Sequence, residues 1–194
     1  KYAIVVCERK HRLDFRDAQT MKVADSVPVP CKGVDHIDFS ANGRYLLASC
    51  EFSAQVVKVD VERRKVVGSV SLEKGGMPQD VKLSPDGKVF YVADMMANGV
   101  YLLDGEKPSR IGFVPTGKGA HGLYVSRDSK VLYVSNRGEG TISLIDLATR
   151  QVAKKWVLPG GGSPDMGGVS TDGKVLWLSG RYNSEVYAID TSDG

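Results

Sequence analysis

The segment Ser84-Pro85-Asp86-Gly87-Lys88, followed by the run Val89–Asp94, decides the fold of this chain. Proline presets the φ angle of a turn, and an Asp-Gly pair supplies the positive φ that a tightly reversing chain requires. The six residues that follow are mostly β-branched or aromatic, which suits a pleated and half-buried surface. The segment therefore predicts a hairpin turn that leads into a β-strand.

The same turn recurs at a nearly constant interval along the chain. Its leading serines are separated by 44, 42 and 44 residues, and the other turns are Ser40-Ala41-Asn42-Gly43-Arg44, Ser126-Arg127-Asp128-Ser129-Lys130 and Ser170-Thr171-Asp172-Gly173-Lys174. A fixed period of forty-odd residues is typical of proteins built from repeated supersecondary units. Each period therefore predicts one structural unit.

Each unit contains four short strands. The strand after each turn is Tyr45–Cys50, Val89–Asp94, Val131–Asn136 or Val175–Gly180; the next, ending at an aspartate, is Val56–Asp60, Val100–Asp104, Ile142–Asp146 or Val186–Asp190; an outer strand follows, as at Lys65–Leu72 and Gln151–Leu158. Four-stranded units at this period are typical of propeller blades, whereas a β-sandwich would not repeat its turn chemistry in phase. We therefore expect an all-β protein, a β-propeller of four-stranded antiparallel blades.

The repeats also predict where each blade begins and ends. We expect a single β-propeller domain fragment over 1–194, with a partial blade at 1–30, full blades at 31–74, 75–116 and 117–159, and a partial blade at 160–194. Eighteen strands, or about 4.5 blades, leave unpaired strand edges at both ends, which natural β proteins avoid. We therefore expect the chain to be part of a longer protein, a ring of six to eight blades.

One strand position should be buried between successive blades. It is occupied by Ile4, Leu47, Tyr91, Tyr133 and Trp177. Because side chains alternate between the two faces of a strand, a register error of one residue would turn this column away from the core.

Composition and charge narrow the classes of function. The chain is 42% hydrophobic and 25% charged, which is ordinary for a globular protein. The net charge is only +3 and the charges are interspersed, which argues against nucleic acid as a partner. No apolar stretch reaches the roughly 18 residues of a membrane span, so none is expected.

The three cysteines leave the redox state open. Cys7, Cys31 and Cys50 lack C-x-x-C spacing, so neither a zinc site nor a thioredoxin-like pair is indicated. One disulfide with a free thiol, or three buried thiols, both fit the sequence. Cys50 stands where other blades carry Asp94 and Asn136, which favours a small packing residue, with a Cys31–Cys50 bridge as the alternative.

A candidate site follows from the alignment of the repeats. In a propeller the inner strands line a channel, and the loops that enter them open on one face with the loops that leave the second strands. We call this face the funnel. Its candidate ligand-binding residues are Asp35, His36, Gln79, Asp80, His121 and Asp165 at the inner-strand entrances, and Arg137 and Arg181 on the second loops.

The position of these residues leads to one geometric expectation. His36, Asp80, His121 and Asp165 each precede a turn serine by four or five residues, so they should converge on the mouth of the channel. Neighbouring aspartates with histidines between them would favour a cation or a protonated imidazole there.

Functional and structural interpretations compete for the funnel residues. His36, His121 and Asp80 are candidates for a metal site, and the histidines could instead ligate haem or act as acid–base groups. The structural alternative is inter-blade hydrogen bonding by the histidines and inter-blade ion pairing by Arg137 and Arg181. No nucleophile elbow or zinc-protease motif is present. No catalytic residue is therefore assigned, and no cofactor is required, although a divalent metal or haem would fit.

The repeats resemble a known family. Tyr133-Val134-Ser135-Asn136, the following Gly140–Asp146 and the preceding Ala120-His121-Gly122 are similar to the motifs of YVTN-repeat (YncE-like) bacterial β-propellers, and Tyr91–Asp94 is a second match. The resemblance recurs in phase over the whole chain. It implies a seven-bladed, extracytoplasmic bacterial protein, periplasmic or secreted, related in fold to the haem-binding propeller of cytochrome-type nitrite reductases.

A fold does not by itself assign an activity. We expect a non-catalytic scaffold that presents the funnel to a small molecule, a peptide or a protein. The alternative is an enzyme or cofactor protein, either a lactonase-like metal-dependent hydrolase or a haem-type redox protein. An absorption spectrum and a metal analysis of the isolated protein would separate these possibilities.

Overall fold

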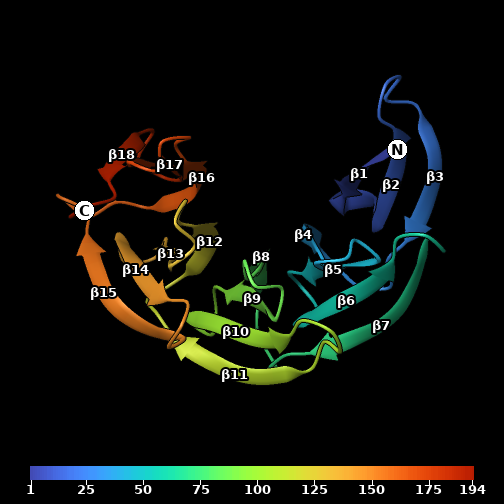
Figure 1. The fold of residues 1–194 in the computed structure, drawn as a ribbon, viewed down its shortest axis with the longest axis horizontal. Helices are drawn as coiled ribbons and strands as arrows, with labels where there is room; N and C mark the ends of the chain where they lie inside the picture. The colour runs from blue at the N-terminus through green and yellow to red at the C-terminus, as the bar shows by residue number, and fades with distance from the viewer.

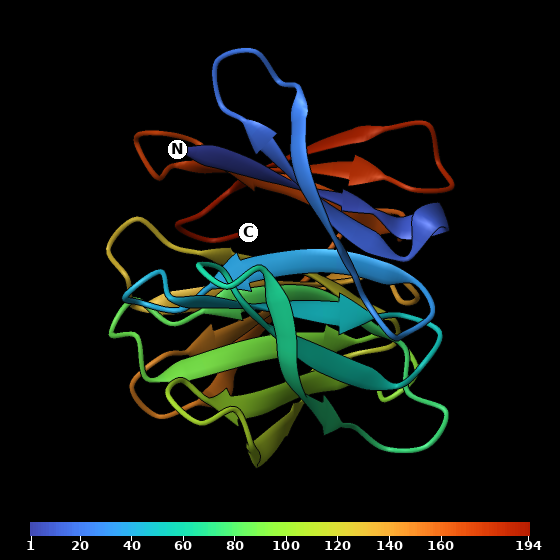
Figure 2. The ribbon, with the colours of Figure 1, turned by 90° about the vertical axis from the view of Figure 1, so that its right-hand side faces the viewer.

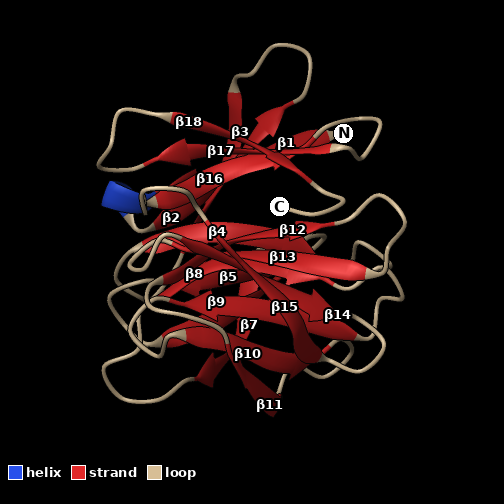
Figure 3. Ribbon diagram, turned by 90° about the vertical axis from the view of Figure 1, so that its left-hand side faces the viewer, coloured by secondary structure: helices blue, strands red, loops and turns tan.

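The strands are arranged as the blades of an open propeller. The computed structural model describes all 194 residues and contains eighteen strands in five antiparallel sheets. Figure 1 shows these sheets placed around an arc, with β4, β8, β12 and β16 on its inner side and β7, β11 and β15 along its rim. Figures 2 and 3 view the arc from its two sides. The expectation of an all-β propeller is confirmed.

We number the blades by their strands. The bounds are, for blade 1, β1 (Tyr2–Cys7), β2 (Arg12–Asp17) and β3 (Val23–Pro28); for blade 2, β4 (Val34–Phe39), β5 (Tyr45–Cys50), β6 (Gln55–Asp60) and β7 (Lys65–Ser71); for blade 3, β8 (Pro78–Leu83), β9 (Val89–Asp94), β10 (Gly99–Asp104) and β11 (Arg110–Pro115); for blade 4, β12 (Ala120–Val125), β13 (Val131–Asn136), β14 (Thr141–Asp146) and β15 (Gln151–Val157); and for blade 5, β16 (Pro164–Val169), β17 (Val175–Gly180) and β18 (Val186–Asp190). The strands that follow the turns begin and end at the predicted residues.

Helical structure is confined to one short turn. The 3₁₀ segment η1 (Glu8–Lys10) follows β1, and the sequence did not predict it. The structure contains no helix of the length and apolar character needed to cross a membrane.

The recurring turn is held by the residues that repeat. Ser84 Oγ donates to Asp86 Oδ1 at 2.6 Å and accepts a hydrogen bond from Val89 N–H at 3.0 Å, while Gly87 takes a φ of 73°. The same serine-to-Asx hydrogen bond occurs in the other three turns. A left-handed φ is costly for residues with a Cβ atom. Blade 4 nevertheless places Ser129 there, at a φ of 60°.

The core consists of apolar layers between neighbouring blades. Leu46 packs in the layer between blades 1 and 2, and Leu47 packs in the layer between blades 2 and 3. Both side chains are fully buried. Tyr91 and Tyr133 continue the predicted column into the next two layers, whereas Ile4 is only half-buried. Trp177 is 48% exposed, contrary to prediction, because no further sheet of the structure covers its face of blade 5.

A disulfide fixes the entrance to β4. It joins Cys31 to Cys50, the last residue of β5, whereas Cys7 is free. The bridge was the alternative in the sequence analysis. Blade 3 uses a hydrogen bond at this place: Asp94 Oδ1, at the position of Cys50, accepts one from Met77 N–H at 3.0 Å. Disulfide and carboxylate thus tie an entrance loop to the same strand end.

Candidate functional site

A bulge in each inner strand builds the funnel. Along β4 the pairing with β5 moves from Val34–Cys50 to Ile37–Ala48, so β4 has one residue more than its partner. The same irregularity occurs in β8, β12 and β16. The residues within the four bulges are Asp35-His36, Gln79-Asp80, His121-Gly122 and Asp165-Met166. Because bulges re-aim side chains, they explain why the candidate residues leave the regular alternation of the strand.

A serine of the adjacent strand holds three of these bulges. Ser49 Oγ accepts a hydrogen bond from His36 N–H at 3.0 Å, and Ser135 Oγ accepts one from Gly122 N–H at 2.8 Å. In blade 5, Ser179 Oγ accepts one from Met166 N–H at 3.3 Å. The hydroxyl thus satisfies a backbone donor that the bulge removes from the regular strand ladder.

The structure brings the predicted residues together in two adjoining groups. His36 lies between two carboxylates, with Nε2 3.4 Å from Asp35 Oδ2 and Nδ1 3.8 Å from Asp80 Oδ1. His121 Nδ1 lies 3.1 Å from Asp165 Oδ1. The two imidazole rings are edge to face, with centroids 6.4 Å apart. Inner strands of four blades therefore share one cluster of ionisable groups.

Arginines from two blades meet at Asp165. Arg137 Nη1 donates to Asp165 Oδ1 at 3.0 Å, and Arg181 Nη1 lies 3.6 Å from Asp165 Oδ2. The other terminal nitrogen of Arg137 approaches Met95 Sδ at 2.7 Å. Arg137 therefore links three blades, which is the inter-blade ion pairing weighed in the sequence analysis, while Arg181 remains largely exposed.

Asp80 and Gln79 have clear structural contacts. The two carboxylate oxygens of Asp80 accept hydrogen bonds from Val81 N–H and Leu123 N–H, both at 2.9 Å. The second bond joins β8 to β12. Burial raises the pKa of Asp80, and nearby His36 partly opposes this effect. Gln79 is also buried and donates to the Met77 carbonyl oxygen at 3.2 Å. Their predicted role in ligand binding stays a prediction.

Burial decides the protonation of His121. It lowers the pKa of the imidazole to about 4, although Asp165 acts in the opposite direction and the positive charge of Arg137 adds to the lowering. A pKa of about 4 favours the neutral imidazole at neutral pH, so it does not support a protonated imidazole at His121, and a cation near the cluster stays a prediction. The Nδ1 atom of His121 makes no hydrogen bond despite the nearby carboxylate.

The metal candidates do not form a ligand set. His36, His121 and Asp80 lie near one another, yet no three His, Cys, Asp or Glu side chains in the structure are arranged to hold a metal ion. The arrangement therefore gives no support to a metal site built from these residues.

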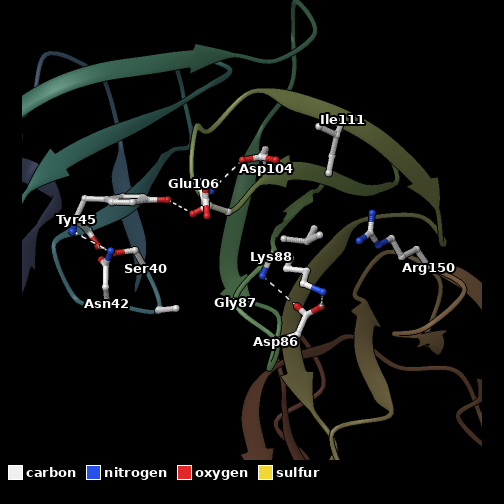
Figure 4. Close-up of a pocket in the computed structure, with 13 residues that line it drawn as sticks. Ser40, Asn42, Tyr45, Asp86, Gly87, Lys88, Asp104, Glu106, Ile111 and Arg150 are labelled. Atoms are coloured by element: carbon white, nitrogen blue, oxygen red, sulfur yellow. Dashed lines mark hydrogen bonds and ion pairs between the residues drawn. The ribbon is translucent and has the colours of Figure 1, made fainter.

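A separate pocket lies at the other end of the inner strands, among the turns. Figure 4 shows its lining residues, and its volume is about 840 Å³. The Tyr45 hydroxyl donates to the Gly105 carbonyl oxygen and so joins blades 2 and 3. The carboxylates of Asp86 and Asp104 accept hydrogen bonds from the backbone of their own turns. These polar groups are already used by the fold, so the pocket carries no functional assignment.

Comparison with known proteins agrees with the blade architecture. The family model of YNCE-like β-propellers matches residues 71–193, more than half of the chain. This chain belongs to the YncE-like β-propeller family. The resemblance inferred from the repeat motifs is therefore confirmed.

Individual relatives match only over part of their length. Antigen Lp49 of Leptospira interrogans is 29% identical over 156 residues, which cover 68% of this chain and 33% of that protein. Hydrazine synthase of Kuenenia stuttgartiensis superposes with a TM-score of 0.84 and 22% identity, covering 98% of this chain and 60% of the other. Dihydro-heme d1 dehydrogenase NirN, in complex with DHE, superposes with a TM-score of 0.72 and 19% identity, covering 97% of this chain and 45% of the other. The chain thus spans one third of Lp49, and the two structures share its fold.

Proposed function

We propose that this YncE-like propeller is a non-catalytic binding protein whose funnel receives a small molecule, a peptide or a protein. The carrying observation is that bulges of four successive blades place ionisable side chains in one cluster. The buried carboxylates there are occupied by the fold, Asp80 by backbone N–H groups and Asp165 by Arg137. Such groups position a ligand more readily than they transfer a proton.

We also propose an extracytoplasmic location, periplasmic or secreted. Disulfides persist in oxidising compartments and are rare in the cytosol of most organisms. The Cys31–Cys50 bridge beside the funnel supports such a location, as does the family resemblance. Mass spectrometry of alkylated protein taken from the native host should find this bridge oxidised; reduced cysteines would contradict the proposal.

Thermal melts with a ligand panel test the binding role. The full-length protein, its Glu51→Arg variant and its Glu106→Arg variant would be melted with amino acids, capped peptides and short oligonucleotides. Glu51 lies on a funnel loop, whereas Glu106 lines the pocket on the opposite face. Compounds that stabilise the wild type and Glu106→Arg, but not Glu51→Arg, would support the proposal. The proposal fails if every compound that stabilises the wild type stabilises Glu51→Arg equally, or if no compound stabilises the protein.

A cofactor-binding propeller is the second candidate. A neutral imidazole is the form that ligates haem iron, and burial keeps His121 in that form. The structural neighbour NirN is described in complex with DHE. His121 would then hold the iron of a bound haem, and the iron would supply redox chemistry. An absorption spectrum of the full-length protein purified from its host decides this: a Soret band that is lost in His121→Phe would favour the cofactor role.

A further inference from the structure

A charged residue interrupts one of the apolar layers between the blades. In blades 1, 3 and 4, strands β2, β10 and β14 place Phe15, Leu102 and Leu144 opposite the inter-blade column, and all three are buried. Lys58 of β6 takes the same position in blade 2, opposite Leu47, and it is half-buried. Lysine is seldom taken into an apolar layer without a partner. Lys58 therefore departs from the repeat at a place where an apolar residue would serve the fold.

The Lys58 ammonium group has no carboxylate partner. Its Nζ atom lies 3.9 Å from the centroid of the Tyr45 ring, a cation–π contact that replaces only part of the lost hydration. Lys107, on the turn between β10 and β11 of blade 3, is also absent from the ion pairs of the structure. The carboxylate of the same turn, Asp104, accepts hydrogen bonds from the backbone N–H groups of Glu106 and Lys107, both at 2.9 Å. Two neighbouring blades thus each supply a lysine without an ion-pair partner.

Both lysines line one cavity between blades 2 and 3. Its volume is about 390 Å³, at the lower end of the range for small-molecule sites. No carboxylate is among the lining residues. The other residues of its wall include Leu47, Val56, Val70, Ser69 and Ser109. The cavity therefore combines positive charge and hydroxyl groups with an apolar wall.

The cavity lies where blade 2 has smaller residues than the blades that follow it. Leu47 takes the column position that Tyr91 and Tyr133 occupy in blades 3 and 4. Gly68 of β7 lies opposite Lys58, and a Cβ atom added to it would meet nothing within 4 Å. The smaller column residue, the open space and the unpaired charge thus occur together. Local departures from a repeat that do not serve packing are expected at functional sites.

From these features we propose that this cavity binds a small carboxylate with an apolar body, such as a short fatty acid. The carboxylate would accept hydrogen bonds from the ammonium groups of Lys58 and Lys107, and the apolar body would pack on Leu47 and Val70. The anion would supply the countercharge that the fold does not provide. The cavity shares no residue with the funnel, so this site goes beyond the proposed function, and either of the two can fail without the other.

The test uses three ligands with the same alkyl chain, hexanoate, hexanamide and hexylammonium, and two anions without it, acetate and inorganic phosphate. NMR titration would measure their binding to the full-length protein, to Lys58→Met and to the control Lys65→Met. Methionine keeps an unbranched side chain and removes the charge, and Lys65 is exposed on the outer strand of the same blade. We expect hexanoate to bind wild type about tenfold tighter than hexanamide, as for one charge-assisted contact. Lys58→Met should abolish that preference, and Lys65→Met should retain it.

A second variant tests the cavity itself. Leu47→Tyr introduces the residue of the next two blades and should abolish the binding of hexanoate and hexanamide alike, with a thermal melt to check folding; if it does not fold, the two lysine variants decide. The inference is overturned if hexanoate does not bind, if it binds no tighter than hexanamide or hexylammonium, or if the two lysine variants act equally. Acetate or phosphate that binds as tightly as hexanoate would also overturn it, because the cavity would then hold an adventitious ion only.

Discussion

Ser135 and Gly122 form the hydrogen bond that holds the bulge beside His121, with Ser135 Oγ accepting from Gly122 N–H at 2.8 Å. The same hydroxyl donates to the Asp165 carbonyl oxygen at 3.0 Å, so it also joins blade 4 to blade 5. A single buried hydroxyl therefore sets the backbone of two blades at the funnel.

Replacing this hydroxyl should destabilise the protein and disturb the site. In Ser135→Ala the buried Gly122 N–H loses its acceptor, which should cost about 1–3 kcal/mol of unfolding free energy. Ser135→Thr keeps a hydroxyl in a strand and should restore most of it. Urea melts measure the stability, and the histidine NMR signals report the position of His121. Equal losses in the two variants would show that packing, not the hydroxyl, matters here.

The packing of Leu47 between two blades can be tested by its effect on stability. Leu47 is fully buried between blades 2 and 3, so Leu47→Ala should lower the unfolding free energy by about 2–5 kcal/mol, the usual range for such core truncations. Val67, in the outer strand of the same blade, is 48% exposed, and Val67→Ala serves as the control with a loss below about 1 kcal/mol. Denaturant melts that show similar losses for the two variants would contradict the register.

Replacing Ser129 in the turn of blade 4 should make the protein more stable. Ser129 has a φ of 60° where the other blades carry glycine, and a left-handed residue with a Cβ atom is strained. Ser129→Gly should therefore raise stability by about 0.5–1 kcal/mol after the entropy of glycine is counted. Gly43→Ser is the reverse change at a position where an added Cβ meets nothing within 4 Å, and it should lower stability by a similar amount. A loss in Ser129→Gly would argue against the strain.

Glu139 should make stability depend on acid. Burial would raise its pKa, but hydrogen bonds from Lys155, Thr141 and the Lys118 backbone lower it to about 2. Because the folded pKa lies below the usual 4.5, this contribution is present above about pH 5 and is lost as the pH falls towards 2. In urea melts, the free energy of unfolding of the wild type should exceed that of Glu139→Gln above about pH 5, and this difference should shrink as the pH falls towards 2. A constant difference between them would contradict the assignment.

The sequence predicted what local chemistry controls. Turns such as Ser84–Lys88 contain their own hydrogen bonds and glycine, so they locate the strands that follow. The bulges were missed because each inner strand has only six residues, as in β4, and one inserted residue shifts the alternation over too few positions to be recognised in the sequence. The available signal was the serine at the fifth position of the adjacent strand, Ser49 in blade 2.

Features that depend on spatial neighbours were beyond the repeat pattern. The pairing of Cys31 with Cys50 depends on the distance between two segments, and the exposure of Trp177 depends on whether another sheet covers blade 5. The neutral state of His121 likewise results from burial, which outweighs the adjacent carboxylate. The composition and the spacing of residues contain no information on which distant segments lie together, so they could not predict these three features.

The most direct test of the funnel as a binding site is a pair of measurements on His121→Phe, which keeps an aromatic ring but removes both nitrogens. Calorimetric titration with a compound that stabilises the wild type and Glu106→Arg but not Glu51→Arg, and a thermal melt, would be run on this variant and on wild type. Because Nδ1 makes no hydrogen bond within the fold although Asp165 lies 3.1 Å away, we expect about tenfold weaker binding, the equivalent of one lost hydrogen bond, with little change in melting temperature. Unchanged binding with a large fall in melting temperature would mean that His121 only holds the blades together.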